Sequence, residues 1–332
     1  MLAVLVLLTR KATELAAWLM QTIRAFLEFK LPTVLMFPGQ GAQAVGMGVA
    51  LCARSPLAAA LFAEASEILG FDLLKLCREG PAEQLSRTEF SQPALFVHAF
   101  AALKQLELER PELWSNVSGV AGLSLGEYTA VAAAGGVSFA DGVRLVQLRG
   151  AAMQAAADAV PSSMSSVLGL DQDKLDAVCK SVSSPDSYVQ IANLLCTGNI
   201  AISGHTAAVE AAELASVDAG AMKAVRLQVA GAFHTPLMEP AVAKLQAALA
   251  DVQFQPTRVH VYSNVDAAPH LEPKEFIELL SRQVVTPVQW EATLKNLIAS
   301  GVDQFIEIGA GRVLAGTLKR VDRKANCENV SE

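Results

Sequence analysis

Short apolar runs alternate with amphipathic stretches along the first part of the chain. Thr33–Phe37 and Val117–Ala121 are apolar runs that lead into glycine-containing turns, which predicts two buried strands. Helical patterns extend over residues 43–79 and 92–108, and an alanine-rich helix is expected at Tyr128–Ala134. Strands that alternate with helices in this way indicate an α/β fold with a parallel sheet.

The middle of the chain has a different order of elements. Four strands are expected at 165–170, 188–195, 199–203 and 222–229, with helices at 171–183 and 206–220. This order, βαββαβ, is typical of a ferredoxin-like unit. We therefore predict a small ferredoxin-like subdomain at 161–229, inserted in a large α/β-hydrolase-like catalytic domain that comprises residues 31–160 and 230–323.

The last part of the chain returns to the first pattern. It predicts a helix at 236–250, a strand at Val259–Tyr262 and then a long helical stretch. A last strand at Gln304–Ile308 and a further helix follow. Residues 324–332 are predicted to form a C-terminal tail.

Residues 1–30 differ from the body of the chain. Residues 1–8 form an apolar run that is too short to span a bilayer, and Thr9–Lys30 is amphipathic, with basic residues between the apolar ones. The pattern fits a remnant of an organelle-targeting segment, a membrane-facing helix or an extra helix packed on the body. We therefore expect an N-terminal extension here.

The composition argues against several classes of protein. Hydrophobic residues make up 52% of the 332 residues and charged residues 18%, which supplies apolar material for a sizeable core. The formal net charge of −7 argues against a nucleic-acid-binding protein, because such proteins are usually basic. The five cysteines lie far apart without CxxC spacing, so neither a disulfide framework nor a zinc site is expected.

The strongest chemical signal is Gly122–Gly126, which reads Gly-Leu-Ser-Leu-Gly. The segment lies between a predicted strand and a predicted helix, as a nucleophile elbow requires, and its glycines permit a turn that lifts the hydroxyl of Ser124 above the sheet. The following helix directs free N–H groups at a developing oxyanion, and the nearest is the amide of Leu125. Ser124 is therefore the candidate nucleophile, with a structural turn residue as the alternative.

Five histidines are candidates for the base that such a serine needs. His234 lies in the loop Gly231–Pro236, directly after a predicted strand and before a predicted helix. The others lie inside predicted elements, at a helix start or in a polar loop (His98, His260, His205 and His270). His234 is therefore the expected general base.

A second glycine-containing loop, Phe37–Gln43, follows the first strand and is expected at the same edge of the parallel sheet as the elbow. It lacks the lysine of a nucleotide-binding P-loop, so phosphate binding is not favoured. The alternative is a tight turn that presents the backbone amide of Gln40 as a second oxyanion donor.

Together these residues resemble the malonyl-CoA:acyl-carrier-protein transacylases of fatty-acid synthesis, over residues 33–323. The resemblance is carried by the elbow and by Pro38–Gly41, Ser91–Pro93, Arg144–Gly150, Gly231–His234, Arg282–Trp290 and Glu307–Arg312. The stretch Ile191–Asn199 is most similar to plastid-type members. A plastid is therefore the expected compartment, with the mitochondrion or the cytoplasm as alternatives.

The resemblance implies a catalytic role at each matching position. Ser124 would be the nucleophile and His234 the base, and the main chain at Gln283 would orient His234. The backbone amides of Gln40 and Leu125 would form the oxyanion hole.

The resemblance also implies how the substrate is held. Arg149 would pair with the free carboxylate of the malonyl group, because a planar guanidinium holds a carboxylate by two parallel hydrogen bonds. Phe233 and Asn193 would contact the substrate, and Phe233 and Leu125 fit the malonyl-type rather than the methylmalonyl-type pattern. The implied partners are malonyl-CoA and acyl carrier protein. No metal and no bound cofactor are expected, and the protein is expected to be a monomer.

One position departs from the family, and two other functions fit part of the pattern. Leu123 stands where the family usually has a histidine, so a polar contact to the thioester donor is expected to be missing. A serine esterase or thioesterase would use the same elbow with water and an acidic third member, for which the candidates are Asp141, Asp158 and Asp186. A carrier-protein-binding scaffold without catalysis is the other alternative.

Overall fold

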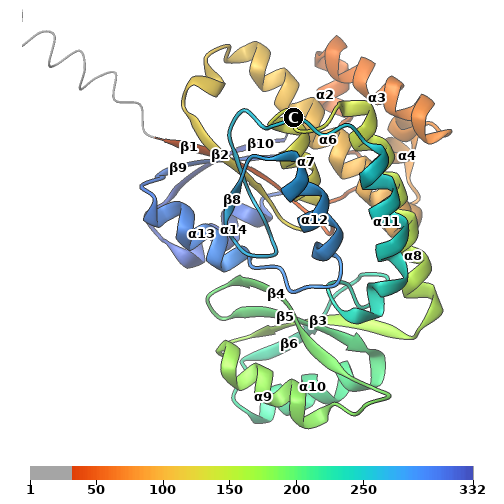
Figure 1. Cartoon of the computed structure of the whole chain (residues 1–332), viewed down its shortest axis with the longest axis vertical. Coiled ribbons are helices and arrows are strands. Elements are labelled where there is room, and N and C mark those ends of the chain that lie inside the picture. Colours follow the sequence, from red (N-terminus) through yellow and green to blue (C-terminus); the bar gives the residue numbers. More distant parts are fainter. Residues whose placement is uncertain (1–31, 332) are drawn as a thin grey trace, which may run out of the picture.

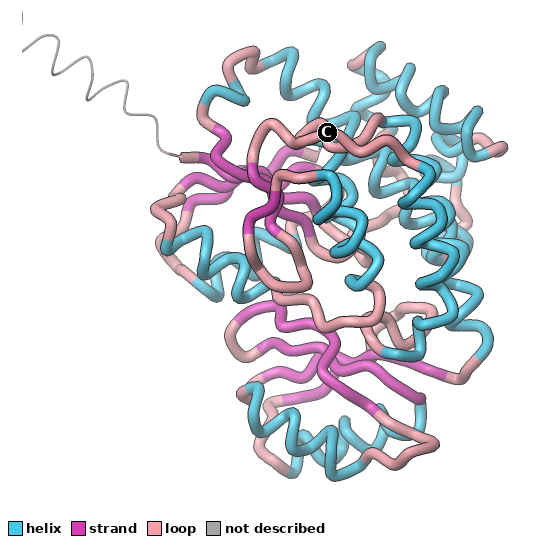
Figure 2. The backbone as a smooth tube through the Cα atoms, viewed as in Figure 1, coloured by secondary structure: helices cyan, strands magenta, loops and turns pink. Residues whose placement is uncertain are grey.

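The structure, a computed structural model, describes residues 32–331, so the predicted N-terminal extension at 1–30 lies outside the described residues. Figure 1 shows two parts, a large one in which helices flank a sheet and a small one in which a second sheet carries two helices. Figure 2 shows the strands gathered in two groups, one in each part.

The large part is built on a six-stranded sheet. Its strands are β1 (Thr33–Phe37), β2 (Val117–Gly122), β7 (His260–Tyr262), β8 (Pro269–His270), β9 (Gln304–Ile308) and β10 (Asn326–Val330). They lie in the order β10-β9-β1-β2-β7-β8, and every neighbouring pair is parallel except β7–β8. Parallel strands are usually covered on both faces, and β1 is accordingly buried from Val34 to Phe37.

Helices cover both faces of this sheet (Figure 1). They are α2 (Val49–Arg54), α3 (Pro56–Leu69), α4 (Leu73–Glu79), α5 (Ala82–Ser86), α6 (Thr88–Glu109), α7 (Leu125–Ala133), α8 (Phe139–Ala159), α11 (Glu239–Asp251), α12 (Pro273–Gln283), α13 (Trp290–Ala299) and α14 (Val313–Val321). Leu35 and Phe37 belong to the core formed with α6, α7 and α8, whereas Val34 and Met36 pack with α13 and α14. Successive side chains of a strand point to opposite faces, so this alternation places β1 between two helical layers.

The small part contains β3 (Ser162–Leu168), β4 (Val189–Cys196), β5 (Asn199–His205) and β6 (Lys223–Arg226), with the helices α9 (Gln172–Val182) and α10 (Thr206–Asp218). Its sheet is antiparallel and has the order β4-β5-β3-β6. Its own core joins Ile202 of β5 to Leu175 of α9 and Val209 of α10. This arrangement of βαββαβ elements confirms the predicted fold class, a large α/β domain with a small ferredoxin-like subdomain.

The helical stretch predicted at 43–79 is divided into three helices. Ser55 caps α3 by accepting a hydrogen bond from the amide of Ala58, and Gly70 ends α3 with a φ of 78°. A left-handed residue at the end of a helix favours glycine, which has no Cβ to clash. The apolar pattern continues across these breaks, so periodicity alone predicted a single stretch.

Several elements of the large part were not predicted, among them the short helix α5 and the short strand β8. Residues 326–330, in the segment predicted as a tail, form β10 and pair in parallel with β9. This strand is mostly polar and lies at the edge of the sheet, so it lacks the apolar run that marks β1 and β2. No range was predicted for the long helix α8, which carries Arg149.

Several contacts join the small part to the large part, among them hydrogen bonds at the junction and along β4. The hydroxyl of Ser162 accepts a hydrogen bond from the amide of Ala232 at 3.1 Å, so the two connections between the parts lie side by side. Val288 donates to the carbonyl of Ala192 at 2.8 Å and accepts from the amide of Leu194 at 2.9 Å. Strand β4 is thereby paired with a segment of the large part, which fixes the two parts relative to each other.

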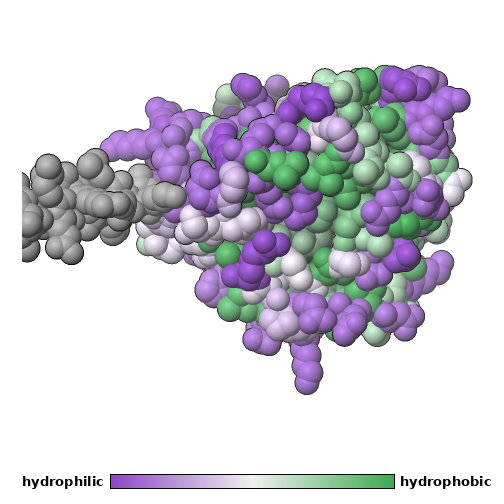
Figure 3. Space-filling model, turned by 90° about the horizontal axis from the view of Figure 1, so that it is seen from above, coloured by the Kyte–Doolittle hydropathy of each residue, from purple (hydrophilic) through white to green (hydrophobic). Residues whose placement is uncertain are grey.

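The surface of the molecule is mixed in character. Figure 3 shows hydrophobic residues gathered toward the middle of the face viewed from above and hydrophilic residues along its margin. Among residues 32–331, no helix is both long and apolar enough to cross a membrane.

Candidate active site

The turn between β2 and α7 is an elbow that only glycine can flank. Ser124 has φ 50° and ψ −100°, which is uncommon for a residue with a side chain. A Cβ placed on Gly122 would lie 2.0 Å from the carbonyl of Gly126, and one placed on Gly126 would lie 2.0 Å from the carbonyl oxygen of Phe37. Close backbone approach on both sides of the serine therefore fixes where its hydroxyl points.

Asn264 holds the elbow from below, a role that the sequence analysis did not find. Its side-chain oxygen accepts a hydrogen bond from the amide of Ser124 at 2.6 Å, and its side-chain nitrogen donates to the carbonyl of Gly122 at 2.7 Å. The asparagine is fully buried and follows β7, the neighbour of β2 in the sheet. It thus stabilises the strained backbone of Ser124 by two hydrogen bonds.

His234 contacts Ser124, although 110 residues separate them in the chain. Its Nε2 lies 2.9 Å from the hydroxyl oxygen of Ser124, and its Nδ1 lies 2.8 Å from the carbonyl oxygen of Gln283. A carbonyl only accepts, so Nδ1 carries the proton and Nε2 is the acceptor that faces the serine. Burial lowers the pKa of His234 to about 4, which keeps the imidazole neutral at pH 7 and able to take up a proton.

Arg149 brings a buried positive charge to the same place. One of its terminal nitrogens donates to the hydroxyl oxygen of Ser124 at 3.0 Å and to the side-chain oxygen of Gln283 at 2.9 Å. The other donates to the side chain of Gln92 at 2.8 Å, and the guanidinium lies over the ring of Tyr128. Burial lowers the pKa of Arg149 from its high ordinary value. This cation is therefore held against the hydroxyl of Ser124 by neutral partners.

The loop after β1 packs directly against the elbow. A Cβ placed on Gly39 would lie 2.4 Å from the carbonyl oxygen of Leu123, so the Gln40 loop and the serine turn touch through their backbones. Gln40 lines the cavity, and Leu125 is the first residue of α7, where amides are left free of helical partners. These positions suit two oxyanion donors, and that role stays a prediction for both residues.

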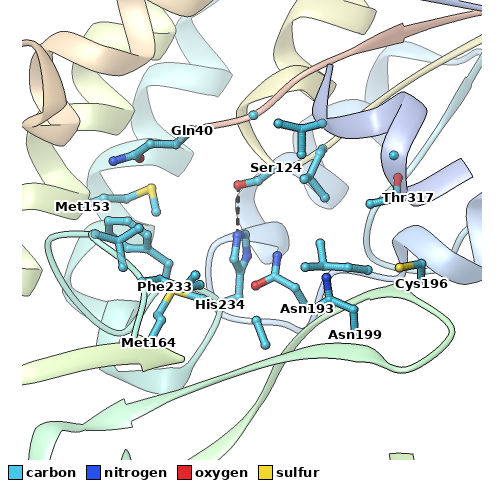
Figure 4. Close-up of a pocket in the computed structure, with 18 of the residues that line it drawn as sticks. Gln40, Ser124, Met153, Met164, Asn193, Cys196, Asn199, Phe233, His234 and Thr317 are labelled. Carbon is cyan, nitrogen blue, oxygen red and sulfur yellow. Dashed lines mark hydrogen bonds between the residues drawn. The ribbon is translucent and has the colours of Figure 1, made fainter. Parts of the chain in front are cut away.

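A cavity of about 480 Å³ opens in front of Ser124. Figure 4 shows His234 pointing at Ser124 in the middle of the cavity, with Gln40, Met153 and Phe233 to one side and Cys196 and Thr317 to the other. The predicted substrate contacts Phe233 and Asn193 both line this cavity, as do Leu123, Leu195, Leu227 and Val313. Most of the lining is apolar, so charges inside it act in a medium of low dielectric constant.

Glu127 and the side chain of Gln283 complete a buried polar network behind the serine. The side-chain nitrogen of Gln283 donates to the carbonyl of Ser124 at 2.9 Å and to Glu127 at 2.6 Å, and Glu127 also accepts from the amide of Asn264 at 3.1 Å. Burial raises the pKa of Glu127 to about 7, although these hydrogen bonds favour its charged form. The sequence showed Glu127 only as an acidic residue in the first turn of a helix, an ordinary feature.

Two of the three acidic candidates for a hydrolase triad lie in other contacts, and the third, Asp186, is exposed in the turn before β4. Asp141 binds Arg144 and Ser138, and Asp158 accepts from Gln154. The partner of His234 is the carbonyl of Gln283 instead. Within residues 32–331, no group of three or more His, Cys, Asp or Glu side chains is arranged to hold a metal ion.

Comparison with known proteins gives consistent matches. Residues 34–331 match the family model described as acyl transferase domain. The chain is 41% identical over 297 residues to the malonyl CoA-acyl carrier protein transacylase of Bacillus subtilis, covering 90% of this chain and 92% of that protein. It is 39% identical over 328 residues to the human mitochondrial malonyl-CoA-acyl carrier protein transacylase, covering 95% of this chain and 82% of that protein. The solved structure of the malonyl CoA-acyl carrier protein transacylase from Coxiella burnetii superposes with a TM-score of 0.87 at 35% identity, covering 91% of this chain and 94% of that one.

Proposed function

The chain belongs to the family of malonyl-CoA:acyl-carrier-protein transacylases, and on that premise we propose that it transfers malonyl groups through an ester on Ser124. The malonyl group comes from malonyl-CoA and goes to the phosphopantetheine thiol of acyl carrier protein, for fatty-acid synthesis. The relatives confirm the predicted family and reaction, since their names include both malonyl-CoA, the donor, and acyl carrier protein, the acceptor.

The observation that carries the mechanism is the contact of Ser124 with both His234 and Arg149, at 2.9 and 3.0 Å. The hydroxyl oxygen attacks the thioester carbonyl of malonyl-CoA, and its proton passes to Nε2 of His234. The backbone amides of Gln40 and Leu125 stabilise the negative charge on the carbonyl oxygen. CoA then leaves as a thiol after taking the proton from Nε2, and the malonyl ester remains on the serine.

The second half of the reaction repeats these steps with a different nucleophile. The thiol of the carrier-bound phosphopantetheine gives its proton to Nε2 of His234 and attacks the ester carbonyl. The ester bond breaks, the proton returns to the oxygen of Ser124, and the malonyl thioester leaves with the carrier. The neutral imidazole is ready for either thiol or hydroxyl, since its proton on Nδ1 is fixed by Gln283.

Arg149 supplies the preference for a substrate that ends in a carboxylate. A guanidinium in an apolar cavity is poorly solvated, so an anion that reaches it replaces little water and forms charge-assisted hydrogen bonds. An acetyl group has no charge to offer. We therefore assign Arg149 as the group that distinguishes malonyl-CoA from acetyl-CoA, with Phe233 and Asn193 shaping the space around the acyl chain.

The test is the intact mass of the protein after mixing with malonyl-CoA or acetyl-CoA, followed by addition of holo carrier protein. The wild type should gain one malonyl group and pass it on. Arg149→Ala should lose roughly 100-fold in malonyl kcat/KM, because hydrogen bonds to a charged group contribute up to about 3 kcal/mol. Arg144→Ala is the matched control, since Arg144 lies on the same helix but is exposed to solvent. Rapid release of free malonate without an adduct would instead identify a thioesterase.

Two further assignments concern the compartment and the oligomeric state. Because Ile191–Asn199 is most similar to plastid-type members, we infer a plastid location, whereas the human relative is named mitochondrial. The full chain fused to a fluorescent protein should enter plastids, and import into mitochondria alone would refute this. We also propose a monomer, which light scattering on the purified protein will test.

A further inference from the structure

The side chain of Gln283 lies between the two buried charges of the site. Its oxygen accepts from Arg149 at 2.9 Å, and its nitrogen donates to Glu127 at 2.6 Å. Arg149 and Glu127 are each 1% exposed. A single amide therefore links a cation that touches the nucleophile to an anion behind it.

The chemistry of the neighbours fixes which way this amide points. A guanidinium cannot accept a hydrogen bond, so the atom that faces Arg149 must be the oxygen. The carboxylate of Glu127 and the carbonyl of Ser124 only accept, so the atom that faces them must be the nitrogen. Turning the amide over would set oxygen against carboxylate and amino group against guanidinium. The negative charge on Glu127 thus opposes that turn more strongly than a neutral group would.

We propose that Glu127 is a positioning residue for malonyl selectivity. It holds the nitrogen of Gln283, which leaves the oxygen of Gln283 for Arg149 and keeps the guanidinium beside Ser124. It also places a compensating negative charge near a buried cation, which favours the charged form of Arg149. The inference rests on the proposed function, because it assigns the group that supports the carboxylate-binding arginine of that reaction.

Loss of this support should affect malonyl and acetyl donors unequally. His234 is oriented by the main-chain carbonyl of Gln283, which lies at the end of α12 and does not depend on the side chain. The base therefore keeps its geometry when the amide is loosened, and Asn264 still holds the backbone of the serine turn. The arginine loses a fixed partner, and an acetyl group makes no use of the arginine.

The deciding variant is Glu127→Gln, which keeps the shape of the side chain and its oxygen acceptor but removes the charge. We expect malonyl kcat/KM to fall about tenfold or more while acetyl kcat/KM stays within about threefold, so that selectivity falls with little change in general activity. Glu307→Gln is the matched control. Glu307 is an equally buried glutamate that accepts from the amides of Leu314 and Ala315 at the start of α14. Its loss should lower stability and leave the selectivity ratio unchanged.

Gln283→Met tests the same link from its other end, since it removes all three hydrogen bonds of the amide, to Arg149, Glu127 and the carbonyl of Ser124, at similar volume. The contact to Ser124 supports the elbow, so general activity should fall as well, and the malonyl-to-acetyl ratio is the readout. The variant should reproduce the loss of selectivity, and adding Glu127→Gln to it should cause no further loss, because the two residues act through one connection. Additive losses, or a wild-type malonyl-to-acetyl ratio in either single variant, would overturn the proposal. Failure of the wild type itself to form a malonyl ester would refute the proposed function instead, so the two failures are distinguishable.

Discussion

The two parts of the molecule meet at one cavity but contribute to it in opposite ways. The large part supplies Ser124, Arg149 and His234, each held by hydrogen bonds to other buried polar groups. From the small sheet come mainly wall residues, among them Met164 and Ala201. Several hydrogen bonds fix the positions of these three side chains of the large part, whereas apolar wall side chains such as Met164 are held only by van der Waals packing.

The difference follows from the chemistry required on each side. A buried charge is costly unless it is paired or hydrogen-bonded, so Arg149 comes with a network of partners. An apolar wall needs only shape, and many side chains of similar volume can provide it. The large part should therefore respond sharply to conservative changes and the small part weakly. Pairs of the same substitution in the two parts test this directly.

The largest difference is expected for serine to alanine. Ser124→Ala removes the proposed nucleophile and should lower malonyl transfer by at least about 10⁴-fold, with no adduct by intact mass. Ser203→Ala in β5 is the counterpart. Ser203 is fully buried, and its hydroxyl has no hydrogen-bond partner among residues 32–331, so its removal should leave transfer unchanged and stability equal or slightly higher. Malonyl transfer by the Ser124→Ala variant would refute the covalent mechanism.

The substitution of asparagine by aspartate should also lower kcat more in the large part than in the small part, but by a smaller factor than the serine substitutions. Asn264→Asp replaces the donor to the Gly122 carbonyl by a second acceptor, which should loosen the elbow and lower kcat by roughly 100-fold, from about 3 kcal/mol of lost stabilisation. Asn199→Asp, in β5 at the cavity wall, keeps its oxygen acceptor for Ser166. Its kcat should remain within about threefold. Equal losses of kcat in stopped-flow acylation would contradict the distinction.

The pH dependence of acylation should also follow the large part. The pKa of His234 is lowered to about 4, so the base stays neutral and acetyl transfer should change less than about twofold between pH 8 and pH 5.5. The pKa of Glu127 is raised to about 7, with Arg149 and Tyr128 as the neighbouring titratable groups. Protonation below that pH weakens the support of Arg149, so malonyl kcat/KM should fall by roughly fivefold as the pH is lowered through 7.

The same groups make opposite contributions to the pH dependence of stability. The folded pKa of His234 lies below its ordinary value of 6.5, so stability decreases as the pH falls from 6.5 toward 4. The folded pKa of Glu127 lies above its ordinary value of 4.5, so stability decreases as the pH rises from 4.5 through 7. Glu127→Gln should flatten the second slope in denaturant titrations, and malonyl acylation by this variant should become nearly independent of pH in that range.

Methionine to alanine should show the smallest effect. Met164→Ala, in β3, enlarges the wall and should raise KM by about threefold with kcat unchanged, while lowering stability by about 2 kcal/mol. Met153→Ala, one turn after Arg149 on α8, also removes a contact of Gln92, the partner of Arg149. Met153→Ala should therefore lower malonyl selectivity more than Met164→Ala does. A larger loss of selectivity in Met164→Ala would contradict the distinction between the two parts.

The sequence predicted the parts of the fold and site that depend on local pattern. The elbow glycines and the loop position of His234 pointed to Ser124 and His234 without a structure, because tight turns require particular residues at fixed spacing. The βαββαβ order of the small part was predictable from the periodicity of its apolar residues. Strand β10 was missed because its polar sequence at a sheet edge has no periodic signal.

The buried network could not be predicted from spacing. Asn264 lies 140 residues from Ser124 in the chain, and Gln283 lies 134 residues from Arg149, so their contacts exist only in the folded molecule. Glu127 is close in sequence but its environment is set by α8 and α12. Arg149 was assigned from a family resemblance, since nothing in its own helix distinguishes it from a surface arginine.

The hydrogen bond between Ser162 and Ala232 has a consequence for how substrate range can evolve or be redesigned. It joins the chain where the small part leaves to the chain where it returns, two residues before His234. The insertion thus leaves and returns at one junction, so it can be exchanged as a module if the pairing of β4 with Val288 is kept. Exchanging it between relatives at this junction would change the cavity wall that faces the acyl chain and leave the position of His234 unchanged. The range of acyl groups could then be altered without changes at Ser124, His234 or Arg149.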